Sequence, residues 1–172
     1  MQKKARSRTE RQSITLNSGR TTINHKIIKA PAELLYKAFT DPSAITVWQA
    51  PGKMTGKVHH FDLKVDGGYQ MSIFYPPSEV EARGKTSEKE DRFYARFVQL
   101  TPNKKIVEAI TFDSDNPAFA GEMIMEVTFE PIGVETSVTI LFKEIPIGIN
   151  PEDNEIGTQL SLEKLAAYVE KK

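Results

Sequence analysis

Glu108 is the side chain in this sequence best placed to do acid–base chemistry. It alternates with Ile106, Ile110 and Phe112, so a strand there would point all four side chains to one face. A carboxylate in an apolar cavity has its pKa raised by desolvation and can act as a general acid or base. Two plainer roles stay open, which are pairing with Arg96 and a position at the edge of a sheet.

The three histidines are the other candidates for catalysis or metal binding. His59 and His60 are adjacent, and His25 lies far upstream. Neighbours on a regular strand point to opposite faces, so the pair cannot both bind one ion. We therefore expect no metal and no cofactor, with one surface and one half-buried histidine. His60 is a second catalytic candidate after Glu108. The sequence contains no nucleophile motif, phosphate-binding loop or dinucleotide-binding fingerprint.

Several large side chains could form the wall of a binding cavity. The aromatic ones combine an apolar ring with a polar atom, and methionines suit an adaptable ligand wall. Each of them could equally be ordinary core. The candidates are Trp48, Tyr69, Met71, Tyr75, Tyr94, Met123 and Met125.

The last stretch of the chain, Asn150 to Lys171, predicts an amphipathic helix that would close such a cavity. Asn150 can cap the first amides, Pro151 suits the first helical position, and Asp153 follows three residues after the cap. An apolar stripe then recurs at helical spacing. Its members are Leu162, Leu165, Ala166 and Val169. A helix of this length is marginal alone in water, so the stripe must pack on something.

The rest of the chain predicts the sheet against which that helix packs. A first strand at 22–29, in which Ile23, His25 and Ile27 alternate with polar residues, precedes two short helices at 31–40 and 42–48. Five or six antiparallel strands follow, at 56–63, 69–75, 91–100, 105–112, 123–129 and around 138–142. The fold class is therefore α+β. One helix is too narrow to cover such a sheet, so we expect a cradle with a cavity.

Composition places the chain among ordinary globular proteins, with a local asymmetry of charge. The 172 residues predict one domain at 21–172, and 23 basic side chains balance 23 acidic ones. Residues 1–20 hold six basic side chains against Glu10, which predicts a flexible basic arm that ends in an edge strand at Ser13–Leu16 or stays solvated. Such an arm could also bind an acidic partner.

The absences in the composition set further expectations. The chain has no cysteine and no apolar run long enough to span a membrane, and the body outside the arm is slightly acidic. We expect a cytoplasmic protein that binds neither membranes nor nucleic acid. The charged segment 78–90 is either a solvated loop or a lid over a pocket mouth.

Five stretches carry a resemblance to a known family. Ile27–Trp48, IIKAPAELLYKAFTDPSAITVW, resembles the opening of START-like (SRPBCC, helix-grip) proteins, and more narrowly of heat-shock-protein-90 ATPase activator homologues. The others follow in the same order as DLKVDGGYQM at Asp62–Met71, GKTSEKEDRFYARFVQLTPNKKIVE at Gly84–Glu108, FAGEMIMEVTF at Phe119–Phe129 and DNEIGTQLSLEKLAAYVE at Asp153–Glu170. The resemblance implies a helix-grip fold, in which a curved antiparallel sheet wraps around the long C-terminal helix, with two short helices between the first two strands.

The resemblance also implies a cavity that accepts a hydrophobic molecule such as a lipid, polyketide or hormone. The family usually has tryptophan after the glycine that is Gly157 here, whereas this chain has Thr158. Thr158 falls on the same helical side as Leu162, so the loss of an indole there predicts a wider cavity, with Thr158 and Leu162 in its wall.

Three functions follow as alternatives. The first is binding of a small hydrophobic ligand between the last helix and the sheet, without defined catalysis. The second is a cyclase, dehydratase or hydrolase that uses Glu108 or His60 in the same cavity. The third is a chaperone-associated interaction module, although the longer activators contain a further domain that this chain lacks. The protein could be a monomer or a homodimer in each case.

Overall fold

The computed structural model of the chain describes residues 20–79, 84–87 and 89–171. The predicted basic arm therefore lies outside the described residues, apart from Arg20. The elements run in the order β1 (Thr22–Ile28), α2 (Ala32–Thr40), α3 (Pro42–Trp48), β2 (Thr55–Asp62), β3 (Gly68–Phe74), β4 (Glu90–Thr101), β5 (Lys105–Phe112), a 3₁₀ turn (Pro117–Phe119), β6 (Met123–Ile132), β7 (Glu135–Lys143) and α4 (Pro151–Glu170). The predicted α+β order is confirmed.

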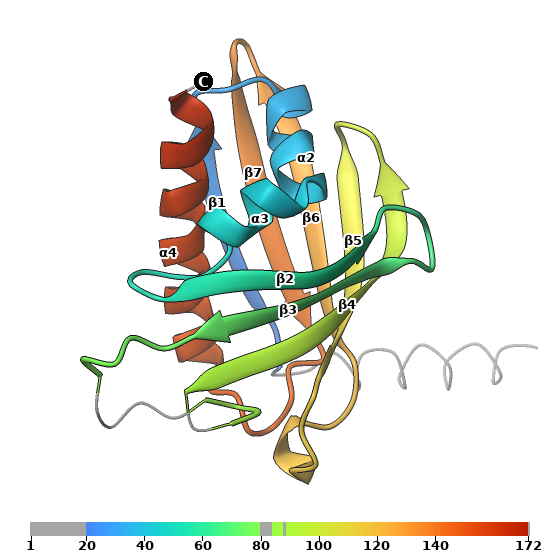
Figure 1. Cartoon of the computed structure of the whole chain (residues 1–172). Coiled ribbons are helices and arrows are strands. Elements are labelled where there is room, and N and C mark those ends of the chain that lie inside the picture. The colour runs from blue at the N-terminus through green and yellow to red at the C-terminus, as the bar shows by residue number, and fades with distance from the viewer. Residues whose placement is uncertain (1–19, 80–83, 88, 172) are drawn as a thin grey trace, which may run out of the picture.

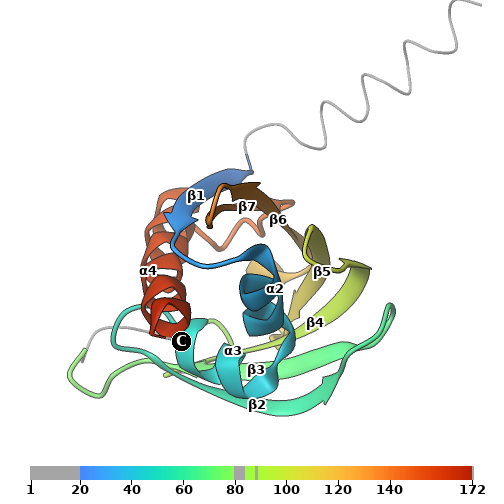
Figure 2. The ribbon, with the colours of Figure 1, turned by 90° about the horizontal axis from the view of Figure 1, so that it is seen from above.

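The described strands form one antiparallel sheet of seven strands in the order β1-β7-β6-β5-β4-β3-β2. Figure 1 shows α4 beside β1 at one edge of the sheet, while β2, β3 and β4 form the other end of the sheet and run across the view. Seen from above, the sheet curls around α2 and α3, and α4 bridges the gap between its two edges (Figure 2). This is the expected helix-grip arrangement, because each apolar stripe of a helix needs a sheet face to bury it.

The local sequence fixes where α3 and α4 begin. The Asn150 side chain accepts a hydrogen bond from the Glu152 amide at 2.8 Å and caps α4, with Pro151 in the first turn. Asp41 caps α3 in the same way through Ser43. Inside the core, the Trp48 indole donates to the Ala38 carbonyl at 2.9 Å and thereby fixes α3 against α2.

In the edge strand β1, the face that carries Ile23 and Ile27 is turned away from the helices. Ile23 and Ile27 are exposed, whereas Asn24 and Ile28 are buried. The Asn24 amide donates to the Glu155 carbonyl of α4 at 3.0 Å, so a polar contact with the helix sets the orientation of this strand. None of the helices in the described part of the chain is long and apolar enough to cross a lipid bilayer.

Two backbone irregularities position side chains near the site. Gly68 adopts a φ of +151°, and a Cβ there would lie 1.9 Å from the Ala95 carbonyl oxygen, so only glycine fits this start of β3. In β2, Val58 pairs with Met71 and His60 with Gln70, which leaves His59 as an extra residue in a bulge.

Candidate ligand-binding site

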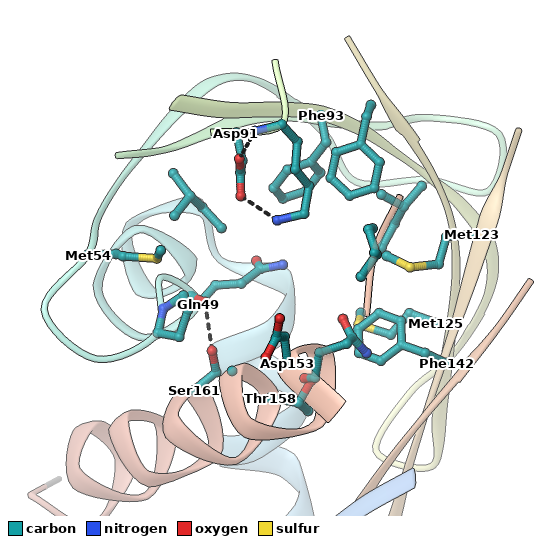
Figure 3. Close-up of a pocket in the computed structure, with 18 of the residues that line it drawn as sticks. Gln49, Met54, Asp91, Phe93, Met123, Met125, Phe142, Asp153, Thr158 and Ser161 are labelled. Carbon is teal, nitrogen blue, oxygen red and sulfur yellow. Dashed lines mark hydrogen bonds and ion pairs between the residues drawn. The ribbon is translucent and has the colours of Figure 1, made fainter. Parts of the chain in front are cut away.

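A cavity of about 550 Å³ lies between α4 and the inner face of the sheet. Its sheet wall is apolar, formed by Ile73, Phe93, Phe112, Met123, Met125 and Phe142 (Figure 3). The opposite wall comes from the first half of α4 and the end of α3. A volume of this size lies in the range of small-molecule pockets, and the predominance of aromatic and aliphatic side chains suits a largely apolar ligand.

An ion pair with a buried carboxylate lies on the β4 side of this cavity. Asp91 is 5% exposed and accepts hydrogen bonds from the Lys85 ammonium at 2.7 Å and the Tyr75 hydroxyl at 3.0 Å. Burial, together with the Asp91 charge, raises the pKa of Tyr75, so its phenol stays protonated. This cluster is the most polar part of the β4 wall and can accept or donate hydrogen bonds to the polar end of a ligand.

The α4 wall contains two hydroxyl groups that already donate their hydrogens to backbone carbonyls. Thr158 donates to the Asn154 carbonyl at 2.7 Å, and Ser161 donates to the Gln49 carbonyl at 2.8 Å. The small Thr158 side chain lines the cavity, where the larger indole of a tryptophan would occupy part of the space. The Gln49 amide reaches into the cavity from the end of α3 (Figure 3).

Glu108 points inward but lies one layer behind the cavity wall. It is 1% exposed and sits opposite Phe97 of β4 and Met125 of β6. Its Oε1 atom has no hydrogen-bond partner among the described residues. Burial raises the pKa of Glu108 to about 7, and the Tyr69 hydroxyl acts in the opposite direction. The carboxyl group is thus poised to change its charge near neutral pH.

The structure separates the ten predicted wall residues into three groups. The first group lines the cavity and comprises Trp48, Tyr75, Met123, Met125 and Thr158. The second is buried in the core next to the cavity and comprises Tyr69, Met71, Glu108 and Leu162. The third is Tyr94 alone, which is 51% exposed on the outer face.

Tyr94 and His60 require correction as site residues. Both border a shallow outer hollow with Arg96, on the face of the sheet turned away from the helices. Tyr94 follows the inward-facing Phe93, so the alternation of the strand turns it outward. The expected Glu108–Arg96 pair is also wrong, because Arg96 lies 3.4 Å from both Asp66 and Glu122 on that outer side.

The two adjacent histidines do not point to opposite faces as predicted. The bulge at His59 turns both of them outward and lets Phe61 face inward, where it stacks on Tyr69 at 5.7 Å. The described residues contain no group of three or more histidine, aspartate or glutamate side chains that could hold a metal ion.

A serine, a histidine and a glutamate do meet on the outer face. His59 Nε2 lies 2.8 Å from Ser72 Oγ, and Ser72 also bonds to Glu90. In a nucleophilic triad the carboxylate orients the histidine, whereas here it contacts the serine directly. Ser72 is fully buried. This cluster therefore ties β2, β3 and β4 together and does not form a nucleophile.

The sequence analysis missed Gln49, Lys85 and Asp91. Asp91 could have been found, because it precedes Phe93 and Ala95 at the period of the inward face of β4. Lys85 and Gly84, which belong to the charged segment 78–90, line the cavity, whereas residues 80–83 and 88 lie outside the described residues. No local pattern marks Gln49, which follows the last residue of a short helix.

Comparison with known proteins places this geometry in a family. Residues 29–170 match the family described as activator of Hsp90 ATPase homolog 1-like protein. The chain belongs to this family. Protein CV1439 from Chromobacterium violaceum, a solved structure, is 31% identical, with a TM-score of 0.76 over 88% of this chain and 97% of that chain. The resemblance read from the sequence is thus confirmed for the family and for the START-like fold.

Other members and neighbours share the fold at lower identity. The AHSA1-like protein from Aeromonas hydrophila is 18% identical, with a TM-score of 0.64 over 87% of this chain and 93% of its own. A protein from Arthrobacter aurescens is 15% identical, with a TM-score of 0.73 over 89% and 87% of the two chains. A comparison with curated protein sequences finds no match. Family and fold together support a ligand-binding or activator-like module.

Proposed function

We propose that this protein binds a small, largely apolar molecule in the cavity between α4 and the sheet, without changing it chemically. The observation that carries the proposal is the apolar sheet wall of a cavity of about 550 Å³, together with two polar groups at defined positions, the buried Asp91 with its partners and the half-buried Gln49. Such a combination binds the body of a ligand by burial and orients it by a few hydrogen bonds.

The chemistry of the wall restricts the kind of ligand. The apolar body would pack on the rings of Phe93, Phe112 and Phe142 and on the methionines of β6. Its polar end would reach the Asp91–Lys85 pair or the Gln49 amide. Since Lys85 is already neutralised by Asp91, a neutral polar group is a better match than a charged one, which would have to break an ion pair whose carboxylate is buried.

A cavity-filling variant tests the proposal. Thr158→Trp places an indole in the cavity, and Glu163→Trp places one on an exposed position of the same helix. With the neutral aromatic probe fluorene, we expect the thermal midpoint of the wild type and of Glu163→Trp to rise, because a ligand selective for the folded state stabilises it. Thr158→Trp should show no shift. Equal shifts in all three proteins would place the probe elsewhere and overturn the proposal.

An activator-like role is the second candidate, because the family description names an activator of Hsp90 ATPase. The ligand-binding proposal expects no change in the ATPase rate of an Hsp90 chaperone when this protein is added. A stimulation that persists in Thr158→Trp would favour the activator role and separate it from the cavity. A stimulation lost in Thr158→Trp would instead connect the two functions.

A further inference from the structure

One carboxylate oxygen in the cavity wall holds a hydrogen-bond donor and a hydrogen-bond acceptor side by side. Asp91 Oδ2 accepts hydrogen bonds from Lys85 Nζ at 2.7 Å and from Tyr75 Oη at 3.0 Å. All three residues line the cavity, and Figure 3 shows Asp91 at its edge with the bonds that it accepts. Because the ammonium and the phenol oxygen bond to the same atom, they are neighbours, and one small ligand group can contact both of them.

The Asp91 carboxylate fixes the direction of both hydrogen bonds. A carboxylate only accepts, so the single hydrogen of the Tyr75 hydroxyl is directed at Asp91. Burial, together with the Asp91 charge, raises the pKa of Tyr75, so the phenol keeps this hydrogen. The Tyr75 oxygen can therefore only accept a hydrogen bond from a ligand. The Lys85 ammonium has three hydrogens, bonds to Asp91 with one of them, and can only donate to a ligand.

Lys85 is held at the cavity by its backbone as well as by its side chain. Its amide donates to Asp91 Oδ1, and the centroid of the Phe112 ring lies 5.8 Å from its ammonium. The next residue is tied to the start of β4, because the Arg92 amide donates to Thr86 Oγ1 at 2.8 Å. Ordering a long side chain costs free energy when a ligand binds, and these contacts order Lys85 before a ligand arrives.

We propose that Asp91, Lys85 and Tyr75 form a hydroxyl-binding site, through which the protein selects apolar alcohols or phenols over ketones, ring N–H compounds and hydrocarbons. The ligand oxygen accepts from Lys85 Nζ, and the ligand hydrogen is donated to Tyr75 Oη. A carbonyl group can use Lys85 alone, and an N–H group can use Tyr75 alone. The adjacent wall, formed by Ile73 and Phe93, is apolar, so a polar atom without a partner there would lose its hydration for nothing.

The Gln49 amide, which also reaches into the cavity, does not impose the same selection. An amide has a donor end and an acceptor end, and Gln49 can turn either of them toward a ligand. It therefore suits a ketone and an N–H group equally well. On α4, the hydroxyl groups of Thr158 and Ser161 already donate to backbone carbonyls. Selection for a hydroxyl group therefore depends on the hydroxyl-binding site.

The inference rests on the proposed ligand binding, and four rigid tricyclic probes of similar size test it. Fluorenol offers a donor and an acceptor, fluorenone only an acceptor, carbazole only a donor, and fluorene neither. We expect fluorenol to bind about threefold to tenfold more tightly than fluorenone or carbazole, the range of one hydrogen bond. Titration followed by the fluorescence of Trp48, the single tryptophan of the chain and part of the cavity wall, measures the affinities. Fluorenol affinity no higher than that of both partial probes would overturn the inference.

Two variants each remove one half of the hydroxyl-binding site. Tyr75→Phe removes the acceptor, so fluorenol and carbazole should bind about threefold to tenfold more weakly relative to fluorene, and fluorenone should not change. Lys85→Met removes the donor, so fluorenol and fluorenone should weaken relative to fluorene, and carbazole should not. The exposed Tyr94→Phe and Lys104→Met are matched controls that should behave as the wild type. An unchanged preference for fluorenol in either site variant, shown by circular dichroism to be folded, would contradict the assignment.

A crystal structure of the wild type with fluorenol gives a readout that needs no variant. The fluorenol oxygen should lie within hydrogen-bonding distance of Lys85 Nζ and Tyr75 Oη, and an oxygen bound to Gln49 instead would overturn the inference. If fluorene binds in the cavity and fluorenol gains nothing over fluorenone and carbazole, the hydroxyl-binding site is wrong and the proposed function stands. If none of the four probes binds, the proposed function is wrong, and the hydroxyl-binding site is refuted with it.

Discussion

Glu108 shows how burial changes the chemistry of an ordinary residue. On an open strand its carboxylate would be hydrated, but here Phe97 and Met125 flank it, and one of its oxygens has no hydrogen-bond partner in the described part of the chain. Desolvation disfavours the charged form, which is why the pKa rises from its ordinary value of 4.5 to about 7. A folded state that holds a proton after the unfolded chain has released it loses stability as the pH rises.

Glu108→Gln should remove this pH dependence of stability. The wild type should be most stable below about pH 4.5 with respect to this group, lose ~3 kcal/mol as the pH rises toward and past 7, and then level off. Glu108→Gln should lack that decline, so it should exceed the wild type in stability at about pH 8.5. Urea unfolding across this pH range measures the difference. The exposed Glu163→Gln is the control, and a wild-type decline in Glu108→Gln would refute the assignment.

At the scale of elements, α4 stabilises the fold through one stripe and forms the site with another part of its surface. Leu162 and Leu165 are fully buried, while Ile156 is 60% exposed on the same helix. The first half of α4, with Thr158 and Ser161, faces the cavity. The helix can therefore keep its packing in the second half while its first half leaves space for a ligand.

Leu165→Ala should lower the free energy of unfolding strongly, whereas Ile156→Ala should hardly change it. Removing a fully buried leucine leaves a cavity in the core, and we expect a loss of about 3 kcal/mol in the free energy of unfolding. The exposed Ile156 should change it by less than about 0.5 kcal/mol. Chemical denaturation with an unchanged m-value would measure both. Similar losses in the two variants would show that α4 does not dock through the stripe described.

The guanidinium group of Arg20 helps to hold the connection from β7 to α4. Arg20 donates to the carbonyls of Ile145, Pro146 and Ile149, at 3.0 Å for Ile145 and 2.7 Å for Ile149. The same segment supplies Gly148, Ile149 and Asn150 to the cavity wall. A fixed fork of donors holds three acceptors in one arrangement, which a lysine cannot do.

Arg20→Ala should loosen this end of the site. We expect a loss of about 2 kcal/mol in stability, since hydrogen bonds to a charged group are the stronger ones, and faster hydrogen exchange at the amides of Gly148 and Ile149. Arg20→Lys should recover only part of the loss. The exposed Lys53→Ala serves as the control, and unchanged exchange rates in Arg20→Ala would contradict a positioning role for this residue.

At the scale of the whole molecule, the site exists because the sheet is broader than the helix that closes it. The strands form one continuous sheet from β1 to β2, and α4 contacts β1 at one edge and α3 near the other. The middle strands β4, β5 and β6 are left with apolar side chains that no helix reaches fully. Their side chains, together with Ile73 of β3 and Phe142 of β7, form the sheet wall of the cavity.

Ligand binding should therefore protect segments that are far apart in the sequence. With fluorene bound, we expect slower hydrogen exchange in β4 near Phe93, in β6 near Met123 and in the first half of α4 at the same time. The β6–β7 turn, where Val134 is 89% exposed, should not change. Protection confined to the outer hollow around His60 and Tyr94 would place the probe outside the cavity.

The sequence by itself determined the period and the ends of most elements. The cap formed by Asn150 and Pro151 marks the start of α4. The two-residue alternation of β5 places Glu108 on the same inner face as Ile106 and Ile110. These signals are local, because capping and alternation involve residues only a few positions apart. The alternation of β4 also indicates that Asp91 faces inward and Tyr94 outward.

Only the tertiary structure decided which face the side chains of β2 point to after the bulge. It also decided which residues pair between segments that are distant in the sequence. One extra residue at His59 sends both histidines outward, and no spacing in the sequence predicts it. Arg96 pairs with Asp66 and Glu122 and not with Glu108, and Gln49 forms a hydrogen bond with Tyr69 of β3. Such choices depend on strand register and on what each face packs against, which are properties of contacts between segments distant in the chain.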